Sequence, residues 1–328
     1  GFLQGGGVGK SLAEWMIHGE PEADVFGMDV SRYGDFAQNK GFIKETTGQF
    51  YSRRFIMIYP NEQLPAGRPL KMAPAYSDMT AAGCRWGVSY GLEVPLYFAP
   101  EGFAEKPSLK RSNAFDIVAE ECRAVREDVG LLDISGFSRF EVTGDGAEAW
   151  LNHVMASKLP AAGRARLAPM LSGEGKMKGD LTVFNWGDGT WWIMGSYYLR
   201  DWHKRWFADH MLEAVEVRDV SDAMVGFSLS GPNSTKVFER VTDGPVDLPF
   251  MGCATMDVGL IRAKVGRLSV TGELGYEIHC SAAEHIGLRH LLLKAGADLG
   301  IKEVGFNALL SLRLEKSFGI WNAEFTQG

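Results

Sequence analysis

Hydrophobic positions in the middle of the chain switch between a helical and an extended period. After Ser112, four apolar residues follow the three- and four-residue spacing of one helix face: Phe115, Val118, Cys122 and Val125. This spacing predicts an amphipathic helix that Ser112 caps and Gly130 ends. Apolar and polar residues then alternate over 137–143, which predicts a half-buried strand. After a glycine turn, helical spacing returns in Ala147, Trp150, Leu151 and Val154.

The pattern from residue 164 onward is rich in predicted strands. Apolar runs separated by glycine-containing turns predict consecutive antiparallel strands at 167–171, 181–186 and 190–194. A helix follows, with helical spacing in Leu199, Trp202, Trp206 and His210. Two further β-rich stretches, at 225–230 and 267–280, alternate with helices at 233–241 and 283–299. Because strands and helices intermingle without a regular βαβ repeat, the sequence predicts an α+β fold.

The N-terminal part of the chain is less regular. Residues 1–30 predict a glycine loop leading into a helix, which Gly19 and Pro21 end. The apolar face of that helix consists of Leu12, Trp15, Met16 and Ile17. Residues 51–59 fit either a strand or a helix end, and the aromatic, glycine-rich stretch 83–98 has no clear period. A new unit therefore starts only near residue 112.

Composition excludes several classes of protein. The 328 residues are enough for two domains, and 45% hydrophobic with 23% charged residues is typical of a globular enzyme. The chain has no apolar run of about 18 residues, so no membrane span is expected, and a formal charge of −7 argues against nucleic acid as a partner. The four cysteines are widely spaced and the seven histidines form no ligand pattern, so neither a disulfide framework nor a metal site is expected.

The glycine-rich start resembles a phosphate-binding loop only superficially. A P-loop needs glycine where Gln4 stands, and a strand before it. A glycine-rich helix start can nevertheless present backbone N–H groups and a positive dipole end to an electron-rich ligand, through Gly6 and Gly7. The N-terminus has neither the basic start nor the apolar middle of a signal peptide. Because it also lacks an initiator Met and opens inside the predicted glycine loop, we expect a truncated sequence.

Asp180 stands where a glycine- and lysine-rich turn enters an apolar strand. Partial burial there would let its carboxylate hold and polarise a ligand amine. The pattern equally allows Asp180 to be a simple turn cap. The nearby cations fit either a basic rim for an anionic tail or a solvated hairpin surface: Arg164, Arg166, Lys176 and Lys178.

A second carboxylate, Glu277, follows a turn that Gly272 and Gly275 bracket. Strand alternation directs Tyr276 and Ile278 to one face and Glu277 to the other. Facing inward, Glu277 can accept two parallel hydrogen bonds from an amino-pyrimidine edge, as in a pterin. An outward, solvated Glu277 fits the pattern equally well.

Taken in order, these segments resemble the folate-binding domain of the glycine-cleavage aminomethyltransferase family. The resemblance rests on five ordered motifs, at 128–147, 169–180, 230–232, 271–277 and 311–316. The first part resembles flavin-containing amine oxidoreductases. Residues 5–15 resemble the last loop and helix of a flavin domain, and 67–69 with 91–95 resemble the linking region of dimethylglycine and sarcosine dehydrogenases.

The resemblance implies a three-part chain. Residues 1–30 would be the C-terminal remnant of an FAD-dependent oxidoreductase domain, and 31–110 its central, linking region. Residues 111–328 would be an α+β, aminomethyltransferase-like folate-binding domain without its C-terminal barrel. The chain is thus expected to be a fragment cut at both ends, with the missing parts of its own full-length chain as partners.

The implied activity is the oxidation of an N-methyl group of dimethylglycine or sarcosine at FAD. Tetrahydrofolate then captures the one-carbon unit as 5,10-methylenetetrahydrofolate, in the cytoplasm or the mitochondrial matrix. By resemblance, Asp180 matches the catalytic Asp, and Glu277 with Tyr276 matches the pterin anchor. Arg313 matches a late-helix position that contributes to cofactor binding, and the flavin loop supplies Gly6 and Gly7.

Departures from the family pattern keep two other functions open. Lys176 and Gly179 stand where the family's hairpin carries a glycine pair and a second acidic residue, which argues against transfer from a lipoyl carrier. One alternative is a folate-dependent demethylase or aminomethyltransferase without flavin. The other is a non-catalytic folate-binding module, which would need Glu277 but not Asp180.

Overall fold

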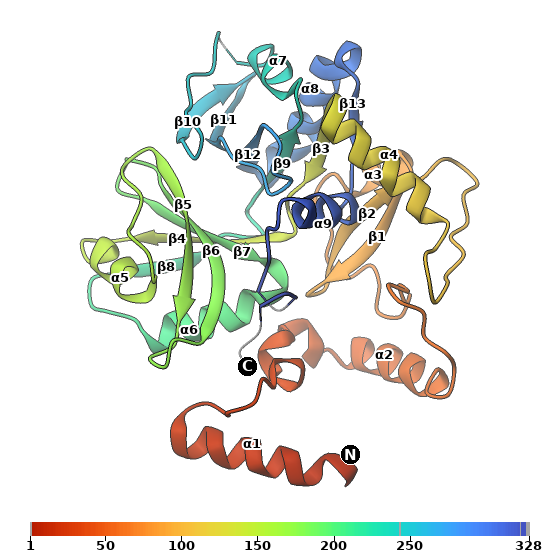
Figure 1. Cartoon of the computed structure of the whole chain (residues 1–328), viewed down its shortest axis with the longest axis vertical. Coiled ribbons are helices and arrows are strands. Elements are labelled where there is room, and N and C mark those ends of the chain that lie inside the picture. The colour runs from red at the N-terminus through yellow and green to blue at the C-terminus, as the bar shows by residue number, and fades with distance from the viewer. Residues whose placement is uncertain (1, 243, 322, 326–328) are drawn as a thin grey trace.

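Two β-sheets form the body of the molecule (Figure 1). The computed structural model describes residues 2–242, 244–321 and 323–325. The six-stranded sheet has the order β10 (Cys253–Val258), β11 (Ile261–Gly266), β12 (Gly275–Ser281), β9 (Met224–Ser230), β3 (Val129–Asp133) and β13 (Ile301–Glu303). The five-stranded sheet has the order β5 (Arg164–Leu171), β6 (Met177–Asn185), β7 (Trp191–Ser196), β4 (Phe137–Thr143) and β8 (Glu216–Asp219). Neighbouring strands are antiparallel, except for the parallel pair β13 and β3.

The chain crosses from one sheet to the other between β3 and β4. Only residues 134–136 separate the two strands, so this short connection holds the two sheets close together. Buried residues fill the junction of the sheets: Phe184, Trp186, Trp192, Met194 and Cys253. The junction is therefore a packed core in its own right.

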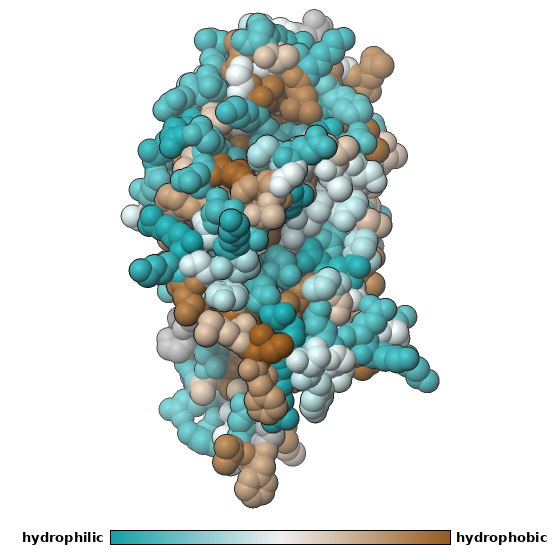
Figure 2. Space-filling view, turned by 90° about the vertical axis from the view of Figure 1, so that its right-hand side faces the viewer, coloured by the Kyte–Doolittle hydropathy of each residue, from teal (hydrophilic) through white to brown (hydrophobic). Residues whose placement is uncertain are grey.

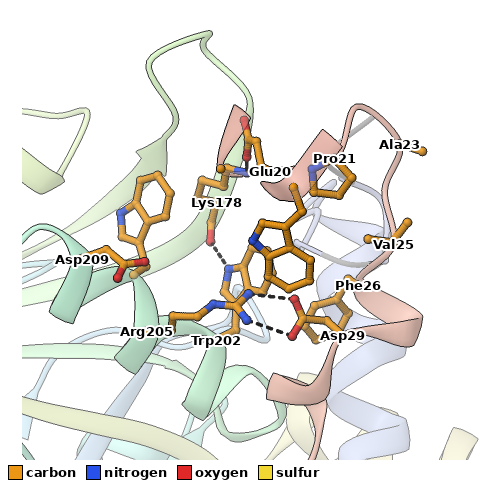
Figure 3. Close-up of a pocket in the computed structure, with 13 residues that line it drawn as sticks. Glu20, Pro21, Ala23, Val25, Phe26, Asp29, Lys178, Trp202, Arg205 and Asp209 are labelled. Atoms are coloured by element: carbon orange, nitrogen blue, oxygen red, sulfur yellow. Dashed lines mark hydrogen bonds and ion pairs between the residues drawn. The ribbon is translucent and has the colours of Figure 1, made fainter. Parts of the chain in front are cut away.

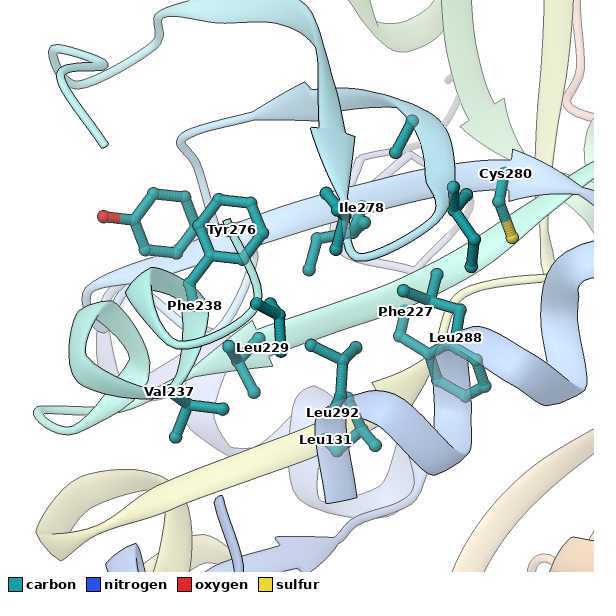
Figure 4. Packing of buried hydrophobic residues seen from close by; sticks show 14 of the residues in the cluster. Leu131, Phe227, Leu229, Val237, Phe238, Tyr276, Ile278, Cys280, Leu288 and Leu292 are labelled. Atoms are coloured by element: carbon teal, nitrogen blue, oxygen red, sulfur yellow. The ribbon is translucent and has the colours of Figure 1, made fainter. Parts of the chain in front are cut away.

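Helices cover the outer face of each sheet. Helices α7 (Ser234–Glu239) and α8 (His285–Gly296) cover the six-stranded sheet, where Phe227, Leu229, Tyr276, Ile278 and Leu292 pack together (Figure 4). Helices α5 (Ala147–Val154) and α6 (Arg200–Asp209) cover the five-stranded sheet, and Trp150 and Phe207 are fully buried there. This burial of apolar side chains is the main stabilising contribution to each layer.

A third layer lies beside the two sheets (Figure 1). It consists of α4 (Ala114–Glu127), α9 (Phe306–Glu315) and the hairpin of β1 (Cys84–Ser89) and β2 (Leu92–Phe98). The buried Glu121 carboxylate joins these elements, since it accepts hydrogen bonds from the backbone N–H of Phe98 (2.6 Å) and of Gly305 (2.9 Å). Burial raises the pKa of Glu121 to about 7, against the effect of these two bonds.

The N-terminal region is built of helices that lie at the lower end of the molecule in Figure 1. They are α1 (Gly5–His18), α2 (Lys40–Ser52) and four 3₁₀ turns at Phe2–Gln4, Phe26–Met28, Val30–Arg32 and Asp35–Gln38. The next helix, α3 (Tyr76–Ala81), lies higher up, beside α4 (Figure 1). Figure 2 shows apolar residues gathered at that lower end. Exposed apolar side chains here include Phe2, Leu3, Met16, Ile17 and Phe55. No helix in the described part of the chain is long and apolar enough to cross a membrane.

The structure confirms the α+β fold and most of the expected elements. The strands predicted from residue 164 onward are β5, β6 and β7, and the helix predicted from Ala147 is α5, whose four predicted apolar residues are all buried. Gly19 ends α1 in the left-handed conformation, with φ of 83°, as glycine tolerates. Residues 51–59 continue from the end of α2 and form no strand.

Three expectations need correction. The glycine run is not a loop, because Gly5, Gly6 and Gly7 form the first turn of α1. Gly130 does not end a helix but lies in β3, and α4 ends at Glu127. Phe115 is 47% exposed, because the buried face of α4 is the one that carries Glu121 and Val125.

Strands β10 and β11 had no sequence prediction, and neither did the hairpin of β1 and β2. Cys253–Val258 mixes buried and exposed positions without regular alternation. Ile261–Gly266 alternates apolar and polar residues over 261–265, so its sequence does carry the period of a half-buried strand. Tertiary packing rather than a local pattern therefore determines β10.

Candidate functional site

Glu277 lies in the middle of the six-stranded sheet and points away from the helices. Its strand neighbours Tyr276 and Ile278 pack in the core beneath α7 and α8 (Figure 4). Glu277 therefore occupies the opposite face of β12. Its side chain is nevertheless buried, at 5% exposure. Of the two sequence interpretations, the inward-facing carboxylate is the one observed.

No hydrogen bond to the Glu277 carboxylate occurs among the described residues. The nearest ion-pair distance is 3.8 Å, from Oε2 to Nε2 of His279. Burial raises the pKa of Glu277 to about 7, and the positive charge of Arg139 opposes this rise. Burying a carboxylate without hydrogen-bond donors costs free energy. A ligand with N–H groups could supply the donors that Glu277 lacks.

The polar surroundings of Glu277 continue along β9 and the turn before β12. Ser228 is the direct cross-strand partner of Glu277. From Ser228, a chain of hydroxyl contacts runs through Ser230 (3.1 Å) and Ser269 (2.7 Å) to Thr271 (2.6 Å). These hydroxyl groups give the face around Glu277 further donors and acceptors for a polar ligand.

Asp180 lies within β6, opposite Pro169 of β5, and is half-buried. It does not cap the turn. Its Oδ2 accepts a hydrogen bond from the backbone N–H of Trp321 (2.8 Å). Burial raises the pKa of Asp180, and the Trp321 N–H and the charge of Arg313 counteract that rise. The environment is that of a partly desolvated carboxylate, which can hold or polarise an amine.

Asp180 and Glu277 lie on strand faces that meet between the two sheets. Asp180 and Phe184 share one face of β6, because they are four residues apart, and Glu277 shares its face of β12 with His279. The rings of Phe184 and His279 are in edge contact, with centroids 6.3 Å apart. The face of β6 that carries Asp180 thus meets the face of β12 that carries Glu277.

Arg313 joins this region from the late helix. It is buried in α9 and forms two hydrogen bonds with the Glu324 carboxylate (2.8 and 3.0 Å) and one with the Phe318 carbonyl (2.8 Å). Its charge lowers the pKa of Asp180. Its Nε is buried without a hydrogen-bond partner in the described part of the chain. The structure therefore brings Arg313 toward Asp180.

The structure does not bring Tyr276, Gly6 or Gly7 to this space. Tyr276 is 1% exposed in the core, and its hydroxyl contacts Thr235 at 3.0 Å. A contribution of Tyr276 to ligand binding would therefore be indirect, through the position of β12. Gly6 and Gly7 lie on the exposed start of α1, with no other atom within 4 Å of the position a Cβ would take.

A small cavity of about 120 Å³ lies beside Asp180's strand, between the N-terminal segment and α6 (Figure 3). Its lining includes Lys178, which is buried and forms an ion pair with Glu20. Arg205 forms a bidentate pair with Asp29 on the other side (2.8 and 3.0 Å). Lys178 is thus neither part of a basic rim nor of a solvated hairpin surface; it attaches the N-terminal segment to β6.

Sequence reasoning missed three residues of the site: Arg139, His279 and Trp321. A signal existed for two of them. Arg139 is a charge inside a predicted half-buried strand, and His279 follows Glu277 by two residues and therefore shares its face. Trp321 acts through its backbone N–H, which no side-chain pattern reveals.

Two family models match this chain. The model described as "GCVT N-terminal domain" matches residues 75–328, and the model described as "FAD dependent oxidoreductase central domain" matches residues 18–73.

The mitochondrial dimethylglycine dehydrogenase of Homo sapiens is similar to this chain. It is 29% identical over an alignment of 332 positions, which covers 99% of this chain and 38% of that protein. The mitochondrial sarcosine dehydrogenase of Homo sapiens is 26% identical over 373 residues, covering 99% of this chain and 40% of that protein. The chain thus spans about two fifths of the length of these relatives.

The fold is similar to that of a solved structure, the glycine cleavage system aminomethyltransferase T from Bartonella henselae. The TM-score is 0.67 at 22% identity, over 79% of this chain and 66% of that one. The expected resemblance to the aminomethyltransferase fold, preceded by a flavin-oxidoreductase region, is confirmed.

The buried state of Glu277 makes a prediction about stability and pH. The folded state holds the Glu277 proton more tightly than the unfolded state, so its contribution to stability falls as pH rises from about 4.5 to about 7. Glu277→Gln removes this loss. In denaturant unfolding curves, the free energy of unfolding of Glu277→Gln should exceed that of the wild type by more near pH 8 than near pH 5. The difference should approach ~3 kcal/mol at the higher pH. The exposed Glu216→Gln should show no such difference, and an equal gain for Glu277→Gln at both pH values would contradict the assignment.

Proposed function

We infer that this chain, which belongs to the family of GCVT N-terminal domains, is the folate-binding part of a flavin-dependent N-methyl amine dehydrogenase. Dimethylglycine and sarcosine are the proposed amines, as in the names of two relatives. The observation that carries the proposal is the buried Glu277 carboxylate, which has no hydrogen bond in the described structure and faces the same space as Asp180. A folate fits this arrangement because its pterin presents adjacent N–H donors and its amine needs an acceptor.

Glu277 is proposed to anchor the pterin. In its ionised form the carboxylate offers two oxygens to two parallel N–H donors, a pairing that gives orientation as well as affinity. Tyr276 and Ile278 anchor β12 in the core, so the carboxylate is presented from a rigid strand. The hydroxyl groups of Ser228 and Ser230 offer further polar contacts on the same side.

Asp180 is proposed to orient the folate amine and to accept a proton from it. The Trp321 N–H occupies Oδ2, and Oδ1 is proposed to face the ligand. A pKa raised by burial makes Asp180 a better base than an exposed aspartate. Tetrahydrofolate supplies the amine that takes up the one-carbon unit, which gives 5,10-methylenetetrahydrofolate. Arg313 is proposed to support this site by its charge.

The flavin part of the proposal concerns the N-terminal region. Gly6 and Gly7, at the start of α1, are proposed to contact FAD, but the open surface around them is no complete flavin site. The remaining contacts would come from a longer protein, as the length of the relatives suggests. We propose the division into an oxidoreductase remnant at 1–30, a linking region at 31–110 and a folate domain from 111. The proposed location is the cytoplasm or the mitochondrial matrix.

The affinity for folate tests the role of Glu277. Titration calorimetry of the chain with tetrahydrofolate should show binding that Glu277→Ala weakens about 100-fold, since it loses two charge-assisted hydrogen bonds. Glu216→Ala, an exposed glutamate on β8, is the matched control and should bind like the wild type. Binding that Glu277→Ala leaves intact would refute the pterin anchor.

The chemistry tests the role of Asp180. In the dehydrogenase that carries this chain, Asp180→Asn should keep tetrahydrofolate affinity within a few-fold. It should slow formation of 5,10-methylenetetrahydrofolate about 100-fold or more, as for the loss of a general base, while amine oxidation continues. Unchanged product formation would instead favour a non-catalytic folate-binding module. Product formation without any flavin would favour a flavin-independent aminomethyltransferase.

A further inference from the structure

Arg139 is the most deeply buried cation of the site region. It lies on β4 of the five-stranded sheet and is 0% exposed. Its guanidinium donates to the carbonyls of Phe137 (2.9 Å) and Ile134 (3.0 Å), which belong to the crossing between the sheets and the start of β4. Its third contact is across the junction, from Nε to Nδ1 of His279 on β12 (3.3 Å). The backbone of the connection between β3 and β4 therefore holds the Arg139 guanidinium in place.

The contact with Arg139 determines the tautomer of His279. An arginine nitrogen can only donate, so Nδ1 of His279 must be the acceptor and carries no proton. A neutral ring then carries its proton on Nε2. Burial and the charge of Arg139 hold the pKa of His279 well below its ordinary value, so the ring stays neutral. His279 is thus a neutral donor through Nε2–H.

The Nε2–H group of His279 points at the site. Nε2 is buried and has no hydrogen-bond partner in the described part of the chain. The nearest carboxylate oxygen is Oε2 of Glu277, at 3.8 Å. The ring cannot turn away freely, because it is wedged between Phe184 (6.3 Å between centroids) and Trp192 (5.6 Å). A small movement of Glu277 would complete this hydrogen bond.

We propose that Arg139 and His279 are positioning residues for Glu277: Arg139 fixes the His279 tautomer, and the His279 Nε2–H holds the Glu277 carboxylate ionised and oriented toward the ligand. This rests on the proposed folate function. The pair supplies one donor to Glu277 from the protein side, so that the remaining lone pairs face the ligand's N–H groups. Because the ionised form accepts both bonds, folate affinity should rise with pH as Glu277 ionises.

The other charged groups around this pair do not replace it. Oδ2 of Asp133 on β3 and Nε2 of His285 on α8 are 3.7 Å apart. Asp133 offsets part of the charge of Arg139. Lys264 on β11 lowers the pKa of His279 further and pairs with Asp188 (3.7 Å). None of these groups donates to Glu277 in the described structure.

The tautomer and the Glu277 titration can be measured without any folate. Long-range ¹H–¹⁵N spectra of the histidine rings should show His279 as the neutral Nε2–H form across neutral pH, and carbon-13 spectra of the glutamate carboxyls should give the Glu277 midpoint. His279→Phe should raise that midpoint by about half a pH unit or more, the value of one neutral hydrogen bond. His279→Gln, whose amide can donate, should restore most of it. Arg139→Lys keeps the charge and should shift the midpoint less than Arg139→Met.

The pH profile of tetrahydrofolate affinity then links the pair to the ligand. The affinity midpoint should follow the Glu277 midpoint in the wild type, His279→Phe and His279→Gln. A Glu277 midpoint unmoved by His279→Phe, or an Nδ1–H tautomer, would overturn the inference even if folate binds. Failure of the wild-type chain to bind tetrahydrofolate would refute the proposed function instead, while the folate-free titration would still decide whether the pair controls Glu277.

Discussion

The packing of the two sheets against each other at Phe184, Trp192 and His279 is the constraint on which the site depends. The crossing at 134–136 is so short that β3 and β4 must lie close, and the aromatic side chains of β6 and β7 fill the junction. Through this contact, a strand of one sheet presents Asp180 and a strand of the other presents Glu277 to one space. Neither carboxylate lies on a mobile loop, so their relative placement is a property of the two sheets.

This arrangement carries an energetic cost at Glu277. A carboxylate buried without a hydrogen bond disfavours its own ionised form, which is why the pKa rises to about 7. With glutamine or an apolar residue in place of Glu277, the folded protein would be more stable at neutral pH. A charge kept where it destabilises the free protein is typical of functional sites. A ligand with two N–H donors would remove most of this cost.

Sequence patterns predicted the local elements well and their assembly poorly. The alternation around Glu277 predicted correctly which side chains face the core, because a period of two follows directly from strand geometry. Asp180 was placed at a strand entrance, but the N–H that holds it comes from Trp321, far away in the sequence. Strand β10 lacks any clear pattern, and Gly5–Gly7 were expected to form a loop although they form a helical turn. The pairing of Arg139 with His279 crosses from one sheet to the other, so no local period could reveal it.

A crystal structure of this chain with tetrahydrofolate bound would show whether Glu277 and Asp180 contact the same ligand. We expect the ligand to enter the space between the sheets, with two N–H groups of its pterin about 3 Å from the Glu277 oxygens and its amine beside Asp180. A ligand bound outside that space, or a pterin that leaves the Glu277 carboxylate without a contact, would contradict this expectation.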